Sequence, residues 1–174
     1  MKRSIDAIEH AGEIMKKVND AVLLTTKKDG QVNTMTISWG GMAIEWGKPL
    51  FITYVRESRF TKEFLDATSE FTVNLPMGEF DKKITAVYGA KSGRDMDKIA
   101  ELGLTLEEPE EVNVPGIREL PLTLECRVLF KQEQDLANLD AEDAEKWYPI
   151  DEALGGPNKH TAYYAEIVAA YVIE

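Results

Sequence analysis

The chain has 174 residues, 44% of them hydrophobic and 29% charged, which is ordinary for one globular domain and excludes wholesale disorder. Its formal net charge of −11 argues against nucleic-acid binding, which requires clustered lysine and arginine. The acidic excess lies in residues 101–152, which hold 15 acidic and 4 basic residues. No apolar run approaches the roughly 20 residues of a membrane span, and the N-terminus does not have the pattern of a signal peptide. We therefore expect a cytoplasmic protein that binds neither membrane nor nucleic acid.

The predicted elements begin with a helix over residues 4–19, where apolar residues recur at helical spacing. Two β-rich segments, 21–26 and 31–39, flank an Asp-Gly turn at residues 28–30 and predict a hairpin. The elements expected next are strands over 42–46 and 50–55, a helix over 60–67, a strand over 71–75 and short helices near 79–88 and 95–102.

The C-terminal part contains two further strands separated by an acidic segment. Apolar residues alternate with polar ones from Leu122 to Phe130 and predict a half-buried strand with Cys126 on its inward face. Residues 133–158 are predicted to be an irregular, acidic insertion, and residues 160–173 a long final strand. Strands dominate at hairpin separations, so we expect one domain over residues 1–174, mainly β, an antiparallel barrel or sandwich with peripheral helices.

The chemistry-bearing motifs of several enzyme classes are absent from the sequence. It has no dinucleotide-binding glycine fingerprint, no phosphate-binding P-loop, no nucleophile elbow and no paired-histidine zinc motif. One cysteine and two histidines cannot form a Cys/His zinc site, and a lone cysteine forms no intrachain disulfide. We therefore expect no metal and no catalytic acid, base or thiol. Cys126 is interpreted as a small buried residue without a redox role.

Residues 33–41 carry the most informative polar pattern. Three hydroxyl residues, Thr34, Thr36 and Ser38, alternate along a strand that ends in Trp39 and two glycines. The hydroxyls suit a polyol or a phosphate, and the glycines would let a planar ring approach the backbone. The alternative is a solvent-facing strand followed by a turn.

Two basic segments could hold an anion. Residues 58–62 place Arg59 and two hydroxyls at a predicted helix N-terminus, where free N–H groups bind phosphate; an ordinary serine N-cap is the alternative. The loop 88–95 presents Lys91 and Arg94, and Arg94 could instead pair with Asp97 at the surface.

The order of these segments resembles the flavin reductase-like, FMN-binding split-barrel family, in particular its flavoredoxin-like branch. The resemblance covers roughly residues 18–173, and its matching segments are 33–40, 49–51, 58–61, 70–76, 92–98 and 160–168. It implies a six-stranded antiparallel split barrel, a homodimer and one FMN per subunit. The cofactor-binding residues that it implies are Asn33, Thr36, Ser38, Trp39, Gly40, Arg59, Thr61, Asn74 and Lys91.

The function implied by this resemblance is transfer of hydride or electrons from NADH or NADPH through bound FMN to a flavin or a redox-protein acceptor. The alternatives are a non-enzymatic FMN electron carrier and a non-redox FMN-binding dimer. The role of His160 stays open, as does that of the acidic segment. A homodimer is also expected because the predicted helix leaves Ile5, Ile8 and Met15 exposed and because residues 161–172 could form an unpaired edge strand.

Overall fold

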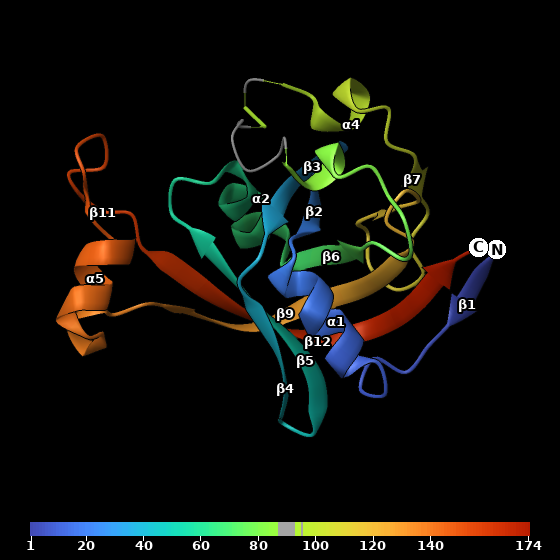
Figure 1. The fold of residues 1–174 in the computed structure, drawn as a ribbon, viewed down its shortest axis with the longest axis horizontal. Helices are drawn as coiled ribbons and strands as arrows, with labels where there is room; N and C mark the ends of the chain where they lie inside the picture. The colour runs from blue at the N-terminus through green and yellow to red at the C-terminus, as the bar shows by residue number, and fades with distance from the viewer. Residues whose placement is uncertain (87–92, 95) are drawn as a thin grey trace.

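The computed structural model describes residues 1–86, 93–94 and 96–174, and its main feature is one antiparallel sheet of eight strands (Figure 1). Seven strands follow the order β3-β2-β6-β9-β12-β5-β4, and β1 pairs with β12. The mainly β antiparallel fold class is confirmed, with two more strands in the sheet than the six expected. The strands of the sheet are β1 (Lys2–Ser4), β2 (Val22–Lys28), β3 (Gln31–Ile37), β4 (Gly40–Glu45), β5 (Lys48–Arg56), β6 (Glu70–Leu75), β9 (Leu122–Glu133) and β12 (His160–Ile173).

Helices and short hairpins surround this sheet. The helices are α1 (Ala11–Asn19), α2 (Phe60–Thr68), α3 (Lys83–Ala86), α4 (Lys98–Glu101), the 3-10 turn η2 (Leu136–Asn138) and α5 (Ala141–Trp147). The two small hairpins are β7 (Leu106–Glu107) with β8 (Gly116–Ile117), and β10 (Ile150–Asp151) with β11 (Gly156–Pro157). None of the helices in the described part of the chain has the length and apolar composition needed to cross a membrane.

The predicted β2–β3 hairpin is present, and its turn has the expected geometry. Asp29 and Gly30 both have positive φ, at 50° and 81°. The register pairs Thr25 with Thr34 and Thr26 with Asn33, which fixes the direction in which each β3 side chain points. The hairpin therefore sets which residues of segment 33–37 face the core and which face the candidate site.

The last strand, β12, is central rather than an edge. It pairs with β9 along most of its length, while β5 covers its first half and β1 its last residues. Register shifts at Tyr164/Ala165 and Ile167/Ala169 mark bulges, which bend a strand and increase its twist. The expectation that 161–172 is an unpaired edge is wrong, because β1 and β5 occupy that side.

The N-terminal helix is shorter than the predicted 4–19. Residues 2–4 pair with the end of β12, and the Asp6 carboxylate accepts hydrogen bonds from the backbone N–H groups of Ile8 and Glu9. This turn delays the helix until Ala11, because it satisfies backbone donors outside a helix. Ile14 and Val18 of α1 are buried against the sheet.

Strand β9 is buried on both faces at its start, contrary to the predicted alternation. Glu125, expected to face solvent, is fully buried and accepts hydrogen bonds from the backbone N–H groups of Glu110, Glu111 and Val112 and from the Tyr171 hydroxyl. The loop that contains these donors covers the outer face of the strand. Cys126 is buried in the core as expected, whereas Phe130 is exposed.

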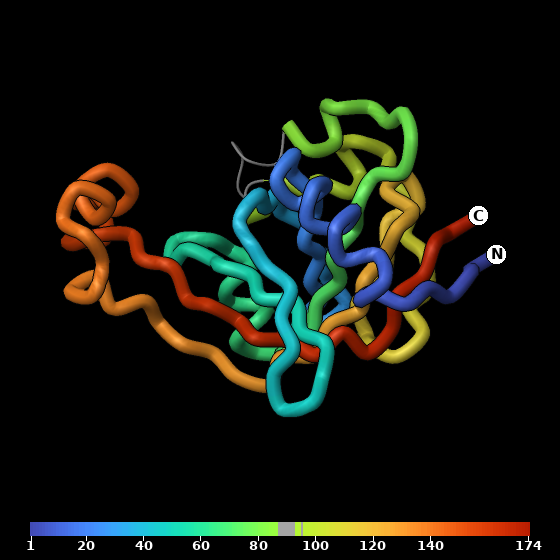
Figure 2. Tube along the Cα trace, turned by 60° about the horizontal axis from the view of Figure 1, so that its bottom comes forward, coloured from blue at the N-terminus to red at the C-terminus, as the bar shows by residue number. Residues whose placement is uncertain are grey.

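Residues 133–158, here called the arm, are not irregular throughout, since they contain η2, α5 and the β10–β11 hairpin. Figures 1 and 2 show the arm projecting from the body of the molecule at the end opposite the two termini. The Asp140 carboxylate accepts from the Glu142 N–H and caps α5, which explains why a helix forms in so acidic a segment. No residue of α5 is buried.

Candidate functional site

A pocket of about 140 Å³ lies where the arm meets the body, between β3 and β5. We call it the β3–β5 pocket. Its lining residues are Met35, Thr36, Ile37, Ser38, Trp39, Tyr54, Arg56, Arg59 and His160. Four of the nine residues predicted to bind the cofactor therefore meet here: Thr36, Ser38, Trp39 and Arg59.

The N-terminus of α2 forms the basic end of this pocket. Arg59 occupies the N-cap position, and no side chain caps the helix, because the Ser58 hydroxyl instead accepts a hydrogen bond from the Asn158 amide at 2.8 Å. The first-turn N–H groups of this nine-residue helix and the Arg59 guanidinium together favour an anion. The alternative of an ordinary serine N-cap is not what the structure has.

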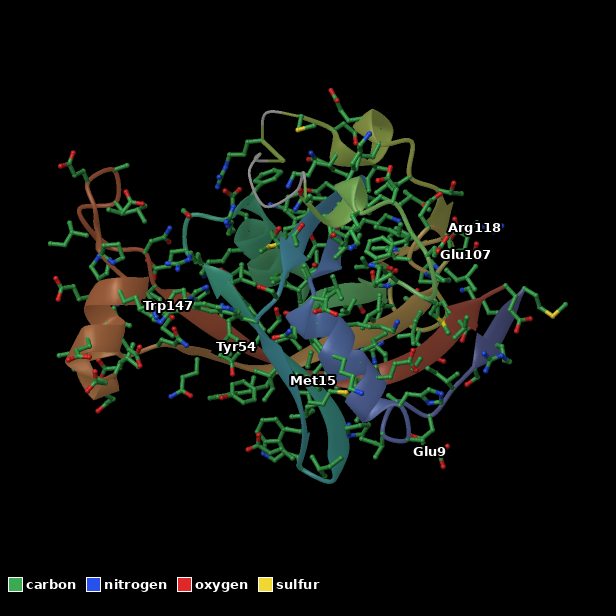
Figure 3. The ribbon with its side chains drawn as sticks, viewed as in Figure 1. Glu9, Met15, Tyr54, Glu107, Arg118 and Trp147 are labelled. Carbon is green, nitrogen blue, oxygen red and sulfur yellow. The ribbon has the colours of Figure 1, made fainter. Side chains whose placement is uncertain are left out.

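Aromatic rings form the other end. The Trp39 indole packs edge-on against Trp147 of the arm, with ring centroids 5.1 Å apart, and lies 5.2 Å from the His160 ring. Figure 3 shows Trp147 on the side of α5 that faces the body, with Tyr54 between it and Met15 of α1. Trp39 remains 39% exposed, so part of its surface is available to a ligand. A second hollow of about 370 Å³, lined in part by Met15, Trp39 and Tyr54, adjoins this end.

His160, whose role the sequence left open, is buried at the wall of the pocket. Its Nδ1 lies 2.9 Å from the Tyr148 hydroxyl. Burial and the nearby guanidinium groups of Arg56 and Arg59 lower the pKa of His160 from 6.5 to about 4. The imidazole is therefore neutral at pH 7, and the positive charge of the pocket comes from the arginines.

A second basic group, Lys98, lies near Arg59 and lines another pocket of about 520 Å³, which we call the α4 pocket. The Lys98 ammonium is buried and donates to the Thr34 carbonyl at 3.0 Å. Burial, and secondarily the charge of Arg59, lower its pKa from 10.5 to about 8. A buried cation of this kind favours a ligand anion nearby, because the anion would stabilise the charged form.

Two of the predicted residues link β3 to α2. The Asn33 amide donates to the Thr61 hydroxyl at 2.9 Å, and both side chains are buried. Asn33 lines the α4 pocket, and its Oδ1 leaves no room for a side chain at position 93, where an added Cβ would lie 2.0 Å away. Asn33 and Thr61 are thus placed beside the basic end, holding the helix N-terminus against the strand.

Gly40 and Asn74 do not line the β3–β5 pocket, although Gly40 lines the hollow that adjoins its Trp39 end. Gly40 packs against β5, where a Cβ would lie 3.0 Å from the Ile52 carbonyl oxygen, so a side chain there would push the neighbouring strand away slightly. Asn74 is fully buried inside the barrel, and its amide bonds Thr25, Thr72 and the Ile117 N–H. The structure does not bring Asn74 to the β3–β5 pocket.

Lys91 lies outside the described residues, as does most of the loop 88–95 in which it was predicted. Arg94 is described, and it donates to the Ser58 carbonyl and pairs with Glu63 of α2 rather than with Asp97. Asp97 instead caps α4. Arg94 therefore lies near the α2 N-terminus with its charge paired by Glu63.

Tyr54 and Arg56 of the β3–β5 pocket and Lys98 of the α4 pocket are polar lining residues to which the sequence assigned no role. Tyr54 and Arg56 occupy alternate positions on β5, between buried residues, and this period-2 pattern could have indicated a second face of the site. Lys98 belongs to segment 92–98 of the family resemblance, but no other sequence feature indicated that it lines a binding site. Its placement depends on the packing of α4 against β3.

The site combines Arg59 at the α2 N-terminus, hydroxyls along β3 and aromatic rings at the other end, where Arg56 lies over the Tyr148 ring. The Thr36 hydroxyl already donates to the Thr85 carbonyl at 2.7 Å, so it can only accept from a ligand, while Ser38 keeps both capacities. Among the described residues there is no cluster of three or more metal-ligating side chains. The arrangement suits an elongated ligand with an anionic end, a polyol middle and a planar ring.

Comparison with known proteins gives a consistent result. The profile of the flavin reductase-like domain matches residues 16–174. A relative of uncharacterised function from Archaeoglobus fulgidus is 34% identical over 101 residues, which span 58% of this chain and 56% of that protein.

Solved structures share the fold. Flavoredoxin from Methanosarcina acetivorans superposes with a TM-score of 0.65 at 26% identity, over 88% of this chain and 68% of the other. An FMN-binding domain of a flavin reductase-like enzyme from Shewanella baltica has a TM-score of 0.67 at 15% identity, over 99% and 77%. Since the matched domain spans most of the sequence, the chain belongs to the flavin reductase-like family.

Proposed function

We propose that the protein is an FMN-dependent oxidoreductase, in which electrons from NADH or NADPH pass through bound FMN to a flavin or a redox-protein acceptor. The observation that carries this proposal is the β3–β5 pocket, whose lining combines the groups that an FMN phosphate, ribityl chain and ring would need: Arg59 at the α2 N-terminus, hydroxyls on β3 and the Trp39 ring. Membership of the flavin reductase-like family and the FMN-binding Shewanella relative support it.

The residues of this chain would divide the binding of FMN between them. Arg59 and Lys98 would hold the phosphate with the α2 N–H groups, Asn33 and Thr61 would keep that helix end in place, and Lys91 would add a contact from its loop. Thr36 and Ser38 would bond the ribityl hydroxyls, and Trp39 would pack against the ring. FAD would require a second phosphate cradle, so we expect FMN.

When bound, FMN supplies the chemistry of one- and two-electron transfer, and the protein supplies binding, orientation and electrostatics. The cations of Arg56 and Arg59 favour negative charge in the pocket, an effect that is stronger where water is excluded. His160 stays neutral at pH 7 and adds no further charge. No side-chain general base is required for this role.

Anaerobic titration of the FMN-loaded protein with NADH and with NADPH, followed at the flavin absorbance band, tests the proposal. Stoichiometric bleaching by either nucleotide supports it, and mass spectrometry of the released cofactor identifies the flavin. Finding FAD, or no flavin at saturating FMN, would refute the cofactor assignment.

The acidic arm favours a second candidate function, that of an electron carrier between proteins. Residues 133–158 hold eight acidic side chains and one lysine, and they project from the body (Figure 2). Trp147 of this arm packs against Trp39 at the aromatic end of the pocket. A negative surface of this kind suits a basic docking partner. Bleaching by a reduced basic redox protein, without bleaching by either nucleotide, would favour the carrier over the enzyme.

We also propose that the protein is a homodimer. The β4–β5 hairpin and β9 expose Ile44, Trp46, Leu129 and Phe130, and Trp46 is 54% exposed. The Trp46 and Phe130 rings lie 6.2 Å apart, so these two exposed residues form a shared apolar patch. Light scattering at low micromolar concentration should give about twice the 19.5 kDa of the chain. A mass near that of one chain would contradict the proposal.

A further inference from the structure

A row of three hydrogen-bonding side chains leads from the arm into the β3–β5 pocket. The Tyr148 hydroxyl donates to the Gln134 side-chain oxygen at 2.7 Å and lies 2.9 Å from His160 Nδ1. Tyr148 and His160 are both buried. Arg56 ties this part of the arm to the body, since it donates to the carbonyls of Trp147 and Asn158.

The number of protons in this row determines which nitrogen of His160 is protonated. A tyrosine hydroxyl has one proton, and that of Tyr148 is directed at Gln134. The second bond must therefore be donated by the imidazole, so Nδ1 carries the proton. In a neutral ring Nε2 is then unprotonated and can only accept a hydrogen bond.

The free acceptor faces the pocket. His160 lines the β3–β5 pocket, and within the part of the chain that the structure describes its Nε2 has no hydrogen-bond partner. In that part of the chain, the fully buried side-chain nitrogen and oxygen atoms without a hydrogen-bond partner are three threonine hydroxyls. Nε2 has no partner and is not among them, so it keeps some accessible surface. It is an acceptor in contact with whatever fills the pocket.

This acceptor differs from the cationic and indole side chains beside it, although the Thr36 and Ser38 hydroxyls of the same pocket can also accept. The side chains of Arg56, Arg59 and Trp39 can only donate hydrogen bonds. A ligand that satisfies them presents acceptors, and His160 would then select one donor group at a defined place. If the proton were on Nε2 instead, His160 would be another donor. It would then disfavour a ligand donor group at this place, because two donors that face each other in a buried site both stay unpaired.

We propose that Tyr148 is a positioning residue that holds His160 in the Nδ1–H tautomer, so that Nε2 accepts a hydrogen bond from an N–H or O–H group of the ligand. The ligand assignment rests on the proposed flavin function, whereas the tautomer does not. Two sources of the donor group share this chemistry: the flavin itself, and a nicotinamide nucleotide bound beside it.

Nitrogen NMR of the full chain without FMN, labelled with ¹⁵N in its histidines and measured at pH 7, tests the tautomer. The sequence has two histidines, so a His10→Gln variant assigns the signals. We expect His160 to show a protonated Nδ1 and an unprotonated Nε2. A protonated Nε2 in the wild type would overturn the proposal.

Variants separate the positioning role from a purely structural one. Tyr148→Phe removes the acceptor, and Gln134→Leu frees the tyrosine proton to point at Nδ1, so both should produce the Nε2–H tautomer. Gln134→Glu keeps an accepting oxygen and should preserve the wild-type pattern. Tyr163→Phe is the matched control, since it removes the hydroxyl of a β12 tyrosine that is bonded to Asp66 and not to His160. An unchanged tautomer in Tyr148→Phe and Gln134→Leu would refute the assignment.

Ligand titrations identify the donor group. A shift of the Nε2 signal on adding FMN assigns the donor to the flavin, and a shift only after adding NAD⁺ assigns it to the nucleotide. In the first case Tyr148→Phe should weaken FMN binding about 2- to 10-fold. FMN binding without any shift in either titration would refute the ligand contact alone. Failure to bind FMN would instead refute the proposed function, while the tautomer would still be measured in the free protein.

Discussion

The buried ammonium of Lys98 leads to a prediction in which stability and ligand binding change in opposite directions. Replacing Lys98 with Met keeps most of the apolar stem and removes the charge. The folded protein holds this lysine at a pKa of about 8, below its ordinary 10.5, mainly because it is buried. Keeping it charged at neutral pH therefore costs folding free energy, and the variant is relieved of that cost.

The size of the effect can be worked out from the two pKa values. The difference between 10.5 and about 8, at about 1.4 kcal/mol for each pH unit, corresponds to about 3 kcal/mol at pH 7. The variant also loses the bond to the Thr34 carbonyl, which leaves a buried acceptor without that donor and costs about 1–3 kcal/mol. We therefore expect Lys98→Met without FMN to be between equally stable and about 2 kcal/mol more stable than the wild type.

The pH dependence of the free energy of unfolding tests the cost of burying the Lys98 charge independently. Above pH 8 the unfolded chain still binds a proton on Lys98 that the folded protein releases, so the free energy of unfolding of the wild type should rise with pH. Between pH 8 and 9.5 the rise should approach about 2 kcal/mol. Lys98→Met should lack this rise, whereas Lys16→Met, which removes an exposed lysine of α1, should keep it.

Urea unfolding of the FMN-free proteins at several pH values measures these changes, and isothermal titration with FMN measures binding. Lys98→Met should weaken FMN binding by about ten- to a hundred-fold, the range expected for one lost bond to a charged group. A wild-type stability that is flat from pH 8 to 9.5, or a variant destabilised by more than about 2 kcal/mol at pH 7, would refute the reasoning.

Other residues give sharper or simpler tests. Arg59→Ala and Lys91→Ala should each weaken FMN binding about ten- to a hundred-fold without unfolding the protein; unchanged affinity in both, by titration calorimetry, would place the phosphate elsewhere. Cys126→Ala should cost about 1–2 kcal/mol and leave the stopped-flow rate of FMN reduction unchanged, because burial raises the pKa of this thiol; rapid thiol labelling of the native protein would contradict this. Glu125→Gln should lower the free energy of unfolding by about 3 kcal/mol in urea, because it faces three backbone N–H donors, and a loss below about 1 kcal/mol would be inconsistent with that role. Because His160 has a folded pKa of about 4, below its ordinary 6.5, its contribution to stability is present above pH 6.5 and is lost as the pH falls towards 4; a pKa near 6.5 by NMR would argue against its burial beside two arginines.

Features set by local sequence were predictable. The Asp29-Gly30 turn, the strands around it and the helix after Arg59 follow from turn chemistry and from the spacing of apolar residues, and all are present. The pocket positions of Ser38 and Arg59 were predicted for the same reason, since each lies at the end of an element that its own sequence specifies.

Features that depend on distant segments were decided by the tertiary structure. The sequence of β12 cannot reveal that β1 and β5 occupy the side expected to be an edge, because strand pairing is made by residues more than a hundred positions away. The burial of Glu125 depends on a loop that brings three N–H donors to it, and a lone glutamate in an alternating strand otherwise indicates solvent.

The candidate site likewise combines features that local sequence indicates with features that only the tertiary structure decides. Hydroxyl and basic residues along β3 and at the start of α2 indicated a binding surface from sequence alone. Only the fold places His160 at its wall with Tyr148 behind it, and only packing buries Lys98 near Arg59. Residue type is local, whereas the protonation of a side chain depends on burial and on neighbours contributed by distant parts of the chain.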